Sequence, residues 1–277
     1  MKTIIQWNVN GYYAHYEQLQ IIIKQHNPDI LCLQETNFKK NHNPSMKNYS
    51  LLVKNRVNTN FASGGVAIAI SNKYSATEIP LKTNLEAIAA TVHFPNKINV
   101  CNVYLPNSQP LHLQDVQDLL EQIPPPVILT GDFNSHNPLW GSSRIDARGK
   151  IIEKILQDPN LILLNTGHPT HFNASNGSLS TIDLTICDPR VAQRTEWSVI
   201  DDLHDSDHFP IKVTYEDNSS HCQFLQTPKW NLDKINWETY QNQINKSLAS
   251  IGEHAINPIK INDIVNGWEQ IIVLKTL

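Results

Sequence analysis

Residues 127–142 read VILTGDFNSHNPLWGS and combine an apolar run with a polar turn. Residues 127–130 form a short apolar run, which predicts a buried β-strand. Gly-Asp-Phe-Asn follows at 131–134, so the strand ends in two polar side chains, those of Asp132 and Asn134. Polar groups in such a place are costly unless they have partners. We therefore predict that Asp132 and Asn134 belong to a functional site.

Polar residues stand at the ends of other apolar runs as well. They are Asn8, Asn10, Glu35, Tyr104, Asp183, Asp207 and His208. If the strands are neighbours, these side chains meet at one rim of the fold. Carboxylates that lie together repel unless a cation lies among them, and oxygen ligands without cysteine suit Mg²⁺ or Mn²⁺. The sequence therefore predicts a magnesium site, with manganese as the alternative ion.

Strand patterns outnumber helical ones in the first three quarters of the chain. The predicted strands are 2–8, 30–33, 49–53, 65–70, 85–94, 98–105, 127–130, 161–164, 179–186, 196–200 and 209–215. The predicted helices are 14–26, 111–123 and 148–156. Several neighbouring strands have short connections, which does not fit a purely parallel sheet. We predict an α/β (α+β) fold of two mixed β-sheets packed face to face with helices outside.

Composition bounds the class of protein and its domain organisation. Of the 277 residues, 40% are hydrophobic and 17% charged, which excludes intrinsic disorder. The composition shifts after Tyr215, so we predict a domain at 1–217 and a linker with a short helical extension at 218–277. The extension contains amphipathic patterns at 237–251 and 261–274. Because the chain stops inside an apolar helical run, two alternatives stay open: the front piece of a longer protein, or a helical tail docked on the domain.

Charge and cysteine usage narrow the partners and the compartment. A net charge of −4 argues against holding nucleic acid by bulk charge alone, but it permits a local basic strip. No acid stands between Glu35 and Glu78, whereas six Lys and Arg residues do. No apolar run approaches the roughly 20 residues that a membrane helix needs, and no signal peptide is found. The cysteines are far apart, and Cys32 and Cys101 lie in apolar runs, so we expect buried thiols, a reducing compartment and no zinc site.

Six short motifs follow one another along the chain, and their order is informative. They are WNVNG (7–11), LQET (33–36), VYLP (103–106), GDFN (131–134), TID (181–183) and SDHFP (206–210). Together they resemble the signature of the endonuclease/exonuclease/phosphatase superfamily over residues 1–215. GDFNSHNPLWGS at 131–142, helped by Arg148-Gly149, is similar to the apurinic-type endonuclease domain of LINE-type (non-LTR) retrotransposons, especially jockey-like elements. The resemblance implies a DNase-like four-layer sandwich.

The resemblance also implies a role for each matching residue. Glu35 matches the main Mg²⁺ ligand, with Asn10 and Asp207 beside it; cellular repair enzymes usually carry Asp at the position of Asn10, whereas retrotransposon members share the Asn. The implied catalytic residues are Asp132, Asn134, His208, Asp183, Tyr104 and Asn8. Asp132 would deprotonate the attacking water with help from Asn134. His208, oriented by Asp183, would bind the scissile phosphate.

For contact with DNA, the basic strip and the resemblance favour a wider set of residues. This set is Lys39, Lys40, Lys54, Arg56, Thr170 and Arg148. By default, a basic stretch of this kind is a solvated surface.

The implied activity is that of a hydrolase acting on ester bonds, a Mg²⁺-dependent endodeoxyribonuclease. It would nick target DNA and leave a 3′-hydroxyl that primes reverse transcription. Residues 228–237 resemble the segment that precedes a reverse transcriptase, so downstream domains would bring the element's RNA as a partner. DNA as substrate implies the nucleus, and no membrane is expected. The alternatives are a cellular abasic-site repair nuclease, another phosphoesterase of the same fold, or a decayed DNA-binding remnant.

Overall fold

The computed structural model describes residues 1–56, 62–216, 238 and 241–242. Contacts along the chain divide it into two units, Met1–Ser219 and Ser220–Leu277. The second unit lies almost wholly outside the described residues, as do the linker and the two helices predicted for 218–277. The boundary at 217 therefore stays a prediction.

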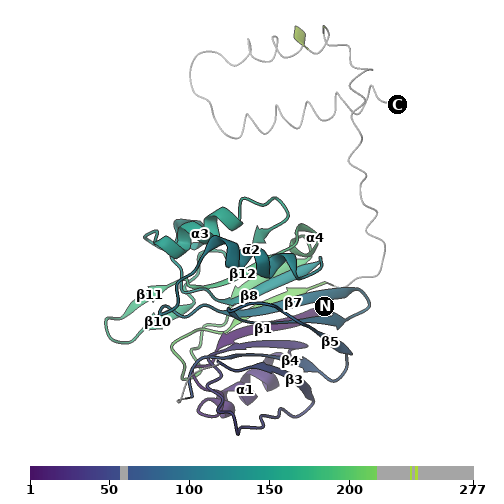
Figure 1. Cartoon of the computed structure of the whole chain (residues 1–277), viewed down its shortest axis with the longest axis vertical. Coiled ribbons are helices and arrows are strands. Elements are labelled where there is room, and N and C mark those ends of the chain that lie inside the picture. Colours follow the sequence, from purple (N-terminus) through teal and green to yellow (C-terminus); the bar gives the residue numbers. More distant parts are fainter. Residues whose placement is uncertain (57–61, 217–237, 239–240, 243–277) are drawn as a thin grey trace. The chain divides into compact units, whose positions relative to one another are not determined.

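The first unit contains two mixed β-sheets of six strands each, which face one another (Figure 1). The first sheet has the order β13-β14-β1-β2-β4-β3. Its strands are β1 (Lys2–Asn8), β2 (Ile30–Gln34), β3 (Tyr49–Lys54), β4 (Val66–Ser71), β13 (Thr195–Val199) and β14 (Ile211–Tyr215). Strands β1 and β2 are parallel, and the other pairs are antiparallel.

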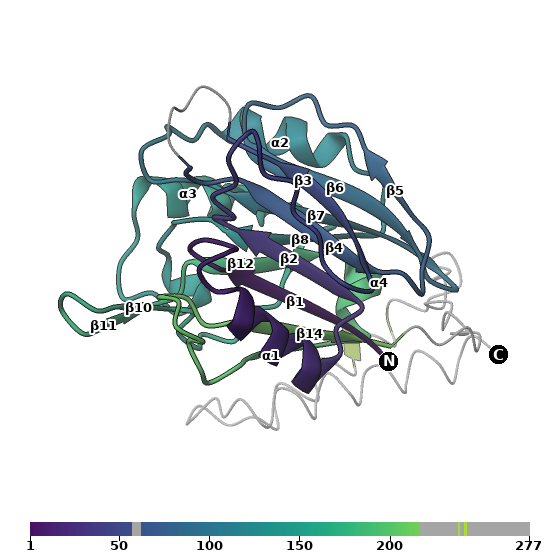
Figure 2. The same ribbon diagram turned by 90° about the horizontal axis from the view of Figure 1, so that it is seen from below.

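The second sheet has the order β5-β6-β7-β8-β12-β9. Its strands are β5 (Ala76–Ile79), β6 (Glu86–His93), β7 (Lys97–Tyr104), β8 (Val127–Asp132), β9 (Ile162–Leu163) and β12 (Asp183–Cys187). Here β7 and β8 form the parallel pair. A separate hairpin consists of β10 (His171–Asn173) and β11 (Ser178–Ser180), and it projects from one end of the sandwich (Figure 2).

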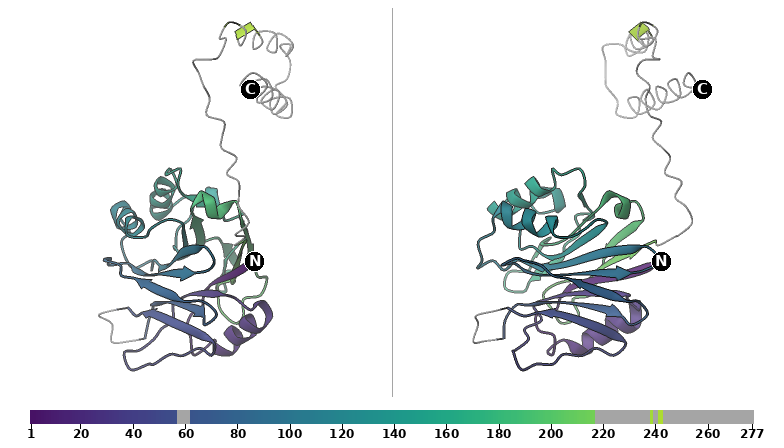
Figure 3. Two further views of the ribbon diagram at one scale, coloured as in Figure 1. Left: turned by 90° about the vertical axis from the view of Figure 1, so that its right-hand side faces the viewer. Right: turned by 45° about the vertical axis from the view of Figure 1, so that its right-hand side comes forward.

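Helices cover the outer faces of both sheets (Figure 3). Helix α1 (Tyr16–His26) packs on the first sheet, and α2 (Leu113–Glu121) and α3 (Ala147–Ile155) pack on the second. The remaining helical elements are η1 (Pro138–Trp140) and α4 (Pro189–Ala192). This arrangement confirms the predicted sandwich of two mixed sheets flanked by helices. No helix of the described part has both the length and the apolar character needed to cross a membrane.

Alternate residues of the central strands face different hydrophobic cores. In β2, Ile30 and Cys32 face the core between the sheets, whereas Leu31 and Leu33 face the core beneath α1. Since both faces are buried, such strands read as continuous apolar runs, and this is why the sequence predicted them well. The thiols of Cys32 and Cys101 are free and buried, as expected, and so is that of Cys187.

Several elements differ from the sequence prediction, among them η1 and α4, which were not predicted. The strand predicted at 179–186 is two strands, β11 and β12. Between them, the Thr170 hydroxyl accepts hydrogen bonds from the N–H groups of Ile182 and Asp183 (3.1 Å each). The backbone there bonds to a side chain and not to a neighbouring strand. Strand β5 was missed because it is a largely exposed edge strand with no apolar pattern. The hairpin strand β10 was missed as well.

Helix α3 packs tightly against the loop that follows β8. The Asp146 carboxylate accepts the Gly149 N–H (2.6 Å), and a Cβ on Gly149 would overlap the backbone carbonyl oxygen of His136. In an open helix Gly→Ala stabilises by about 1 kcal/mol. Here we expect Gly149→Ala to destabilise by about 1–3 kcal/mol because of the overlap. Urea unfolding measures the change, with Lys150→Ala on the exposed side as control; a Gly149→Ala variant as stable as the wild type would contradict the packing.

Candidate active site

The strand directions bring the predicted polar residues to one rim. In the first sheet Asn8 ends β1 opposite Gln34, the last residue of β2. In the second sheet Tyr104 ends β7 opposite Asp132, the last residue of β8. Asp183 begins the antiparallel strand β12 directly opposite Asp132. The carboxyl ends of both parallel pairs therefore meet at the same end of the sandwich.

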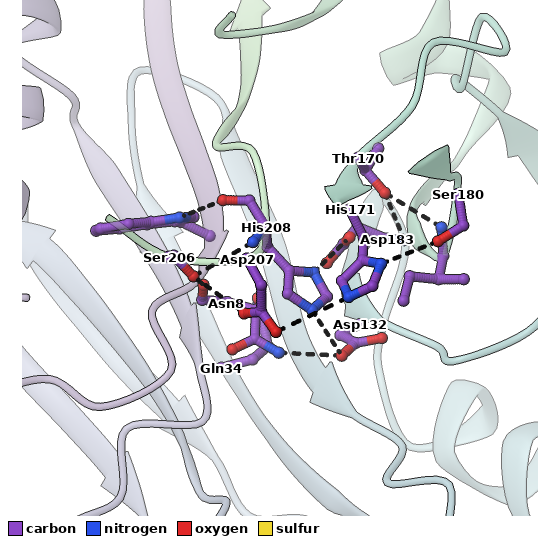
Figure 4. Close-up of polar contacts among 12 residues, drawn as sticks. Asn8, Gln34, Asp132, Thr170, His171, Ser180, Asp183, Ser206, Asp207 and His208 are labelled. Atoms are coloured by element: carbon purple, nitrogen blue, oxygen red, sulfur yellow. Dashed lines mark hydrogen bonds and ion pairs between the residues drawn. The ribbon is translucent and has the colours of Figure 1, made fainter. Parts of the chain in front are cut away.

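A buried histidine lies between two carboxylates at this rim (Figure 4). His208 Nδ1 is 2.8 Å from Asp183 Oδ2, and its Nε2 is 3.9 Å from Asp132 Oδ2. The His208 side chain is 6% exposed and each carboxylate 1%. Burial would lower the pKa of His208, but Asp183, Asp132 and Asp207 together raise it to about 10. Burial and the Asp183 charge raise the pKa of Asp132, while the His208 charge opposes this rise.

Neighbouring side chains hold this histidine and its partner in place. Gln6 Nε2 donates to the second oxygen of Asp183 (3.0 Å), and Gln6 is fixed in turn by the Thr130 hydroxyl (2.9 Å). The Trp7 indole N–H donates to the backbone carbonyl of His208 (2.9 Å). The ring and the carboxylate are therefore pre-oriented, which an active site needs.

Asn8 links the two sheets across the rim. Its Nδ2 donates to Glu35 Oε1 and to Asp132 Oδ2, both at 3.0 Å. Asn134 donates to Asp132 through its backbone N–H (2.9 Å) and its side-chain amide (3.1 Å). Its φ of 47° lies in the left-handed region, which Asn tolerates better than most residues. Asn8 thus links Glu35 to Asp132, and Asn134 bonds to Asp132 directly.

The predicted metal ligands lie beside this group. Asn10 Nδ2 is 3.5 Å from Asp207 Oδ1, and the Asn10 backbone N–H donates to Asn8 (3.1 Å). Glu35 and Asp207 line the same cleft, of about 990 Å³, as Tyr104, Asp132, Asn134 and His208. Their donor atoms are carboxylate and amide oxygens, with no sulfur among them, and this set suits a hard divalent cation. The side chains of the predicted trio therefore fit Mg²⁺ chemically.

The residues expected to contact DNA fall into two groups. Lys39 and Lys40 are exposed on the loop after β2. By contrast, Thr170 is fully buried and bonds to the backbone of Asp183, and Lys54 Nζ donates to the carbonyl of Leu85 (3.0 Å).

Arg148 also belongs to the interior group. Its guanidinium donates to four backbone carbonyl oxygens, those of Leu105, Pro106, Gln109 and Phe133. We therefore correct the expectation for Thr170, Lys54 and Arg148, because each of these side chains bonds to the backbone of the fold. Arg148 instead ties the end of β7 to the loop after β8.

Sequence reasoning missed several residues of the site. Gln6 holds Asp183, the Ser206 hydroxyl donates to the Asn8 carbonyl (2.8 Å), and His171 Nε2 is 3.8 Å from Asp207. One signal was available, because Gln6 is a polar residue inside the apolar run 2–8. Ser206 stands in the SDHFP motif, but no role was assigned to it, and no local pattern distinguishes His171, the first residue of β10.

The pairing of His208 with Asp183 gives a testable pKa. We expect Asp183→Asn to lower the pKa of His208 from about 10 toward its ordinary value, because the variant removes the partner charge. NMR titration of the imidazole in metal-free buffer measures it, with His26 as internal control. The pKa of His208 is higher in the folded than in the unfolded protein. The stability that its pairing with Asp183 contributes is therefore fully present below the unfolded pKa of about 6.5, and it is lost as pH rises through the folded pKa. An unchanged His208 pKa in Asp183→Asn would contradict the pairing.

Comparison with known proteins agrees with this geometry. A family model described as endonuclease-reverse transcriptase matches residues 98–212. The chain is 25% identical over 249 residues to the probable RNA-directed DNA polymerase from transposon X-element of Drosophila melanogaster, covering 88% of this chain and 27% of that protein. It is 27% identical over 210 residues to the RNA-directed DNA polymerase from mobile element jockey of the same species, covering 74% and 23%.

The chain thus spans about a quarter of the length of the curated relatives it matches. Among solved structures, it resembles the endonuclease domain of TRAS1, a telomere-specific non-LTR retrotransposon. That match has a TM-score of 0.65 and 22% identity and covers 78% of this chain and 99% of that domain. The chain is therefore similar, as its motifs predicted, to the endonuclease-reverse transcriptase family over residues 98–212, to the RNA-directed DNA polymerases of the X-element and jockey, and in fold to the endonuclease domain of TRAS1.

Proposed function

We propose that the domain is a Mg²⁺-dependent endonuclease that nicks one strand of DNA. Water would attack the phosphorus and the 3′ oxygen would leave, so the nick would carry a 3′-hydroxyl and a 5′-phosphate. The observation that carries the proposal is the buried Asp132–His208–Asp183 group, in which Asp132 and His208 line the same cleft as Glu35 and Tyr104. The relative named as an endonuclease domain supports the same class of reaction.

The protein groups have complementary tasks in this reaction. A phosphodiester is an anion, and attack by water builds further negative charge at phosphorus. His208, kept charged by Asp183, donates a hydrogen bond to a phosphate oxygen and stabilises that charge. Asp132 accepts the proton of the attacking water, with Asn134 and Asn8 holding its carboxylate in position.

Tyr104 supplies a second donor to the phosphate. Burial and the neighbouring Glu35 carboxylate raise the pKa of the Tyr104 hydroxyl, so it keeps its proton at neutral pH. A protonated hydroxyl at the cleft wall donates to a phosphate oxygen without adding negative charge beside the substrate. This assignment makes Tyr104 a hydrogen-bond donor to the phosphate as it reacts and not a base.

The metal would be held by Glu35, Asn10 and Asp207, with Mn²⁺ as an alternative to Mg²⁺. When bound, it would supply Lewis-acid stabilisation of the charge that develops on the phosphate. The oxygen-only donor set of these three side chains supports this assignment.

In the longer relatives the domain would act as the first enzyme of insertion. The 3′-hydroxyl at the nick is the chemical group that a polymerase extends, and the curated relatives are named as RNA-directed DNA polymerases. We propose that downstream domains bind the element's RNA and extend the nick. A chromosomal target implies that the protein works in the nucleus.

Two alternatives predict different substrates. A cellular repair nuclease of the same fold would act on abasic sites, and a small-molecule phosphoesterase would not cut intact DNA. Cleavage rates of an intact duplex and of a duplex with one abasic site, measured at equal concentrations, distinguish these activities. Cleavage confined to the abasic duplex would replace the retrotransposon assignment by the repair one. Assembly of the motif residues around one cleft argues against a decayed DNA-binding remnant, which would bind DNA and leave it uncut.

We expect the purified chain to convert supercoiled plasmid to open circles in Mg²⁺ and to stop when EDTA removes the ion. Asp132→Asn should lower the rate by about 10²–10⁴-fold, since it removes the base while keeping the side-chain size. Gel quantification of open circles measures both effects. Asp158→Asn, an exposed acid beyond α3, serves as the matched control. Nicking that persists in EDTA, or an Asp132→Asn variant of wild-type rate, would overturn the assignment.

A further inference from the structure

An ion pair outside the catalytic group lies against Tyr104. Glu86 begins β6 and stands directly opposite Tyr104 in β7, so the two side chains share one face of the sheet. Arg56 reaches them from the end of β3 in the other sheet. Its Nε is 2.6 Å from Glu86 Oε1, and its Cζ is 5.6 Å from the centre of the Tyr104 ring. One guanidinium therefore contacts both an acid and the face of an aromatic ring, a cation–π arrangement.

The same carboxylate also fixes the segment that carries Glu35. Glu86 Oε2 accepts the Gly65 N–H at 2.5 Å. The carbonyl oxygens of Gly65 and Gly64 accept the N–H groups of the two residues after Glu35, at 3.2 and 2.8 Å. Movement of Glu86 would thus displace both Arg56 and the segment that carries Glu35, the predicted main metal ligand.

The backbone at Gly64 lies close against the Arg56 guanidinium and restricts its movement. A Cβ on Gly64, which has a φ of +60°, would overlap the Arg56 guanidinium. The side chain of Arg56 is 24% exposed and that of Glu86 10%. Arg56 Nη2 is buried and has no hydrogen-bond partner in the part of the chain that the structure describes. Arg56 is therefore packed into the cleft wall and is not a free surface cation.

We propose that Arg56 and Glu86 are positioning residues, which hold the Tyr104 ring and the Glu35 segment in the geometry needed at the phosphate. The proposal rests on the proposed nuclease function and deepens it. Arg56 acts through Tyr104, because its guanidinium lies against that ring and is held there by Glu86. This role replaces the general DNA contact that the basic strip suggested for Arg56.

A double-mutant cycle tests the coupling between Arg56 and Tyr104. We expect Arg56→Met to lower kcat for plasmid nicking by about tenfold while KM stays within about twofold, because positioning is lost and not binding. Adding Arg56→Met to Tyr104→Phe should cost less than threefold more. Lys54→Met is the matched control, since Lys54 also reaches the start of β6 but is not assigned to Tyr104. Independent, multiplicative effects, or a change in KM alone, would overturn the proposal.

A second readout does not depend on activity. In tyrosine-labelled protein, the Tyr104 ring signals are identified by their loss in Tyr104→Phe. Arg56→Met and Glu86→Gln should shift these signals, whereas Lys54→Met should leave them in place. Unshifted signals would overturn the positioning role even in an active enzyme. If the wild type fails to nick DNA while the signals shift, the contact stands and the proposed nuclease function is what fails.

Discussion

Two carboxylates, Asp132 and Asp183, lie directly opposite one another on neighbouring strands in the interior of the protein. Like charges in such a pair repel, and burial strengthens the repulsion. The imidazole of His208 relieves this repulsion by lying between them as a cationic partner. Because breaking a buried charge group leaves an uncompensated charge, all three must be present together. Much of the surrounding structure follows from this requirement.

The fold satisfies that requirement through strand direction. Each sheet has one parallel pair, and both pairs deliver their carboxyl ends to the same rim. His208 arrives from the other sheet, in the segment before β14, so the group is complete only when the two sheets have packed. Asn8 then joins Asp132 to Glu35 across the sandwich. The site therefore forms when the two sheets pack together.

The sequence predicted those elements that a pattern of neighbouring residues marks. Strands such as β2 and β8 are buried on both faces and read as apolar runs, and the motif residues at their ends are those that meet at the rim. What it could not predict depends on contacts between distant segments. The division of the strand at 179–186 needs the hydroxyl of Thr170, and the exposed edge strand β5 has no pattern to detect. Arg148 looked like a surface cation but bonds to carbonyls that only the folded chain brings near it.

The chain corresponds to about a quarter of its curated relatives, so its own chemistry is what can be tested on it directly. The central claim is that water attacks phosphorus at the buried carboxylate–histidine group and expels the 3′ oxygen. Cleavage of a duplex in ¹⁸O-labelled water under single-turnover conditions, followed by mass spectrometry of both fragments, tests this claim most directly. We expect one heavy oxygen in a 5′-phosphate and an unlabelled 3′-hydroxyl. A labelled 3′-phosphate, or label in a hydroxyl group, would contradict it.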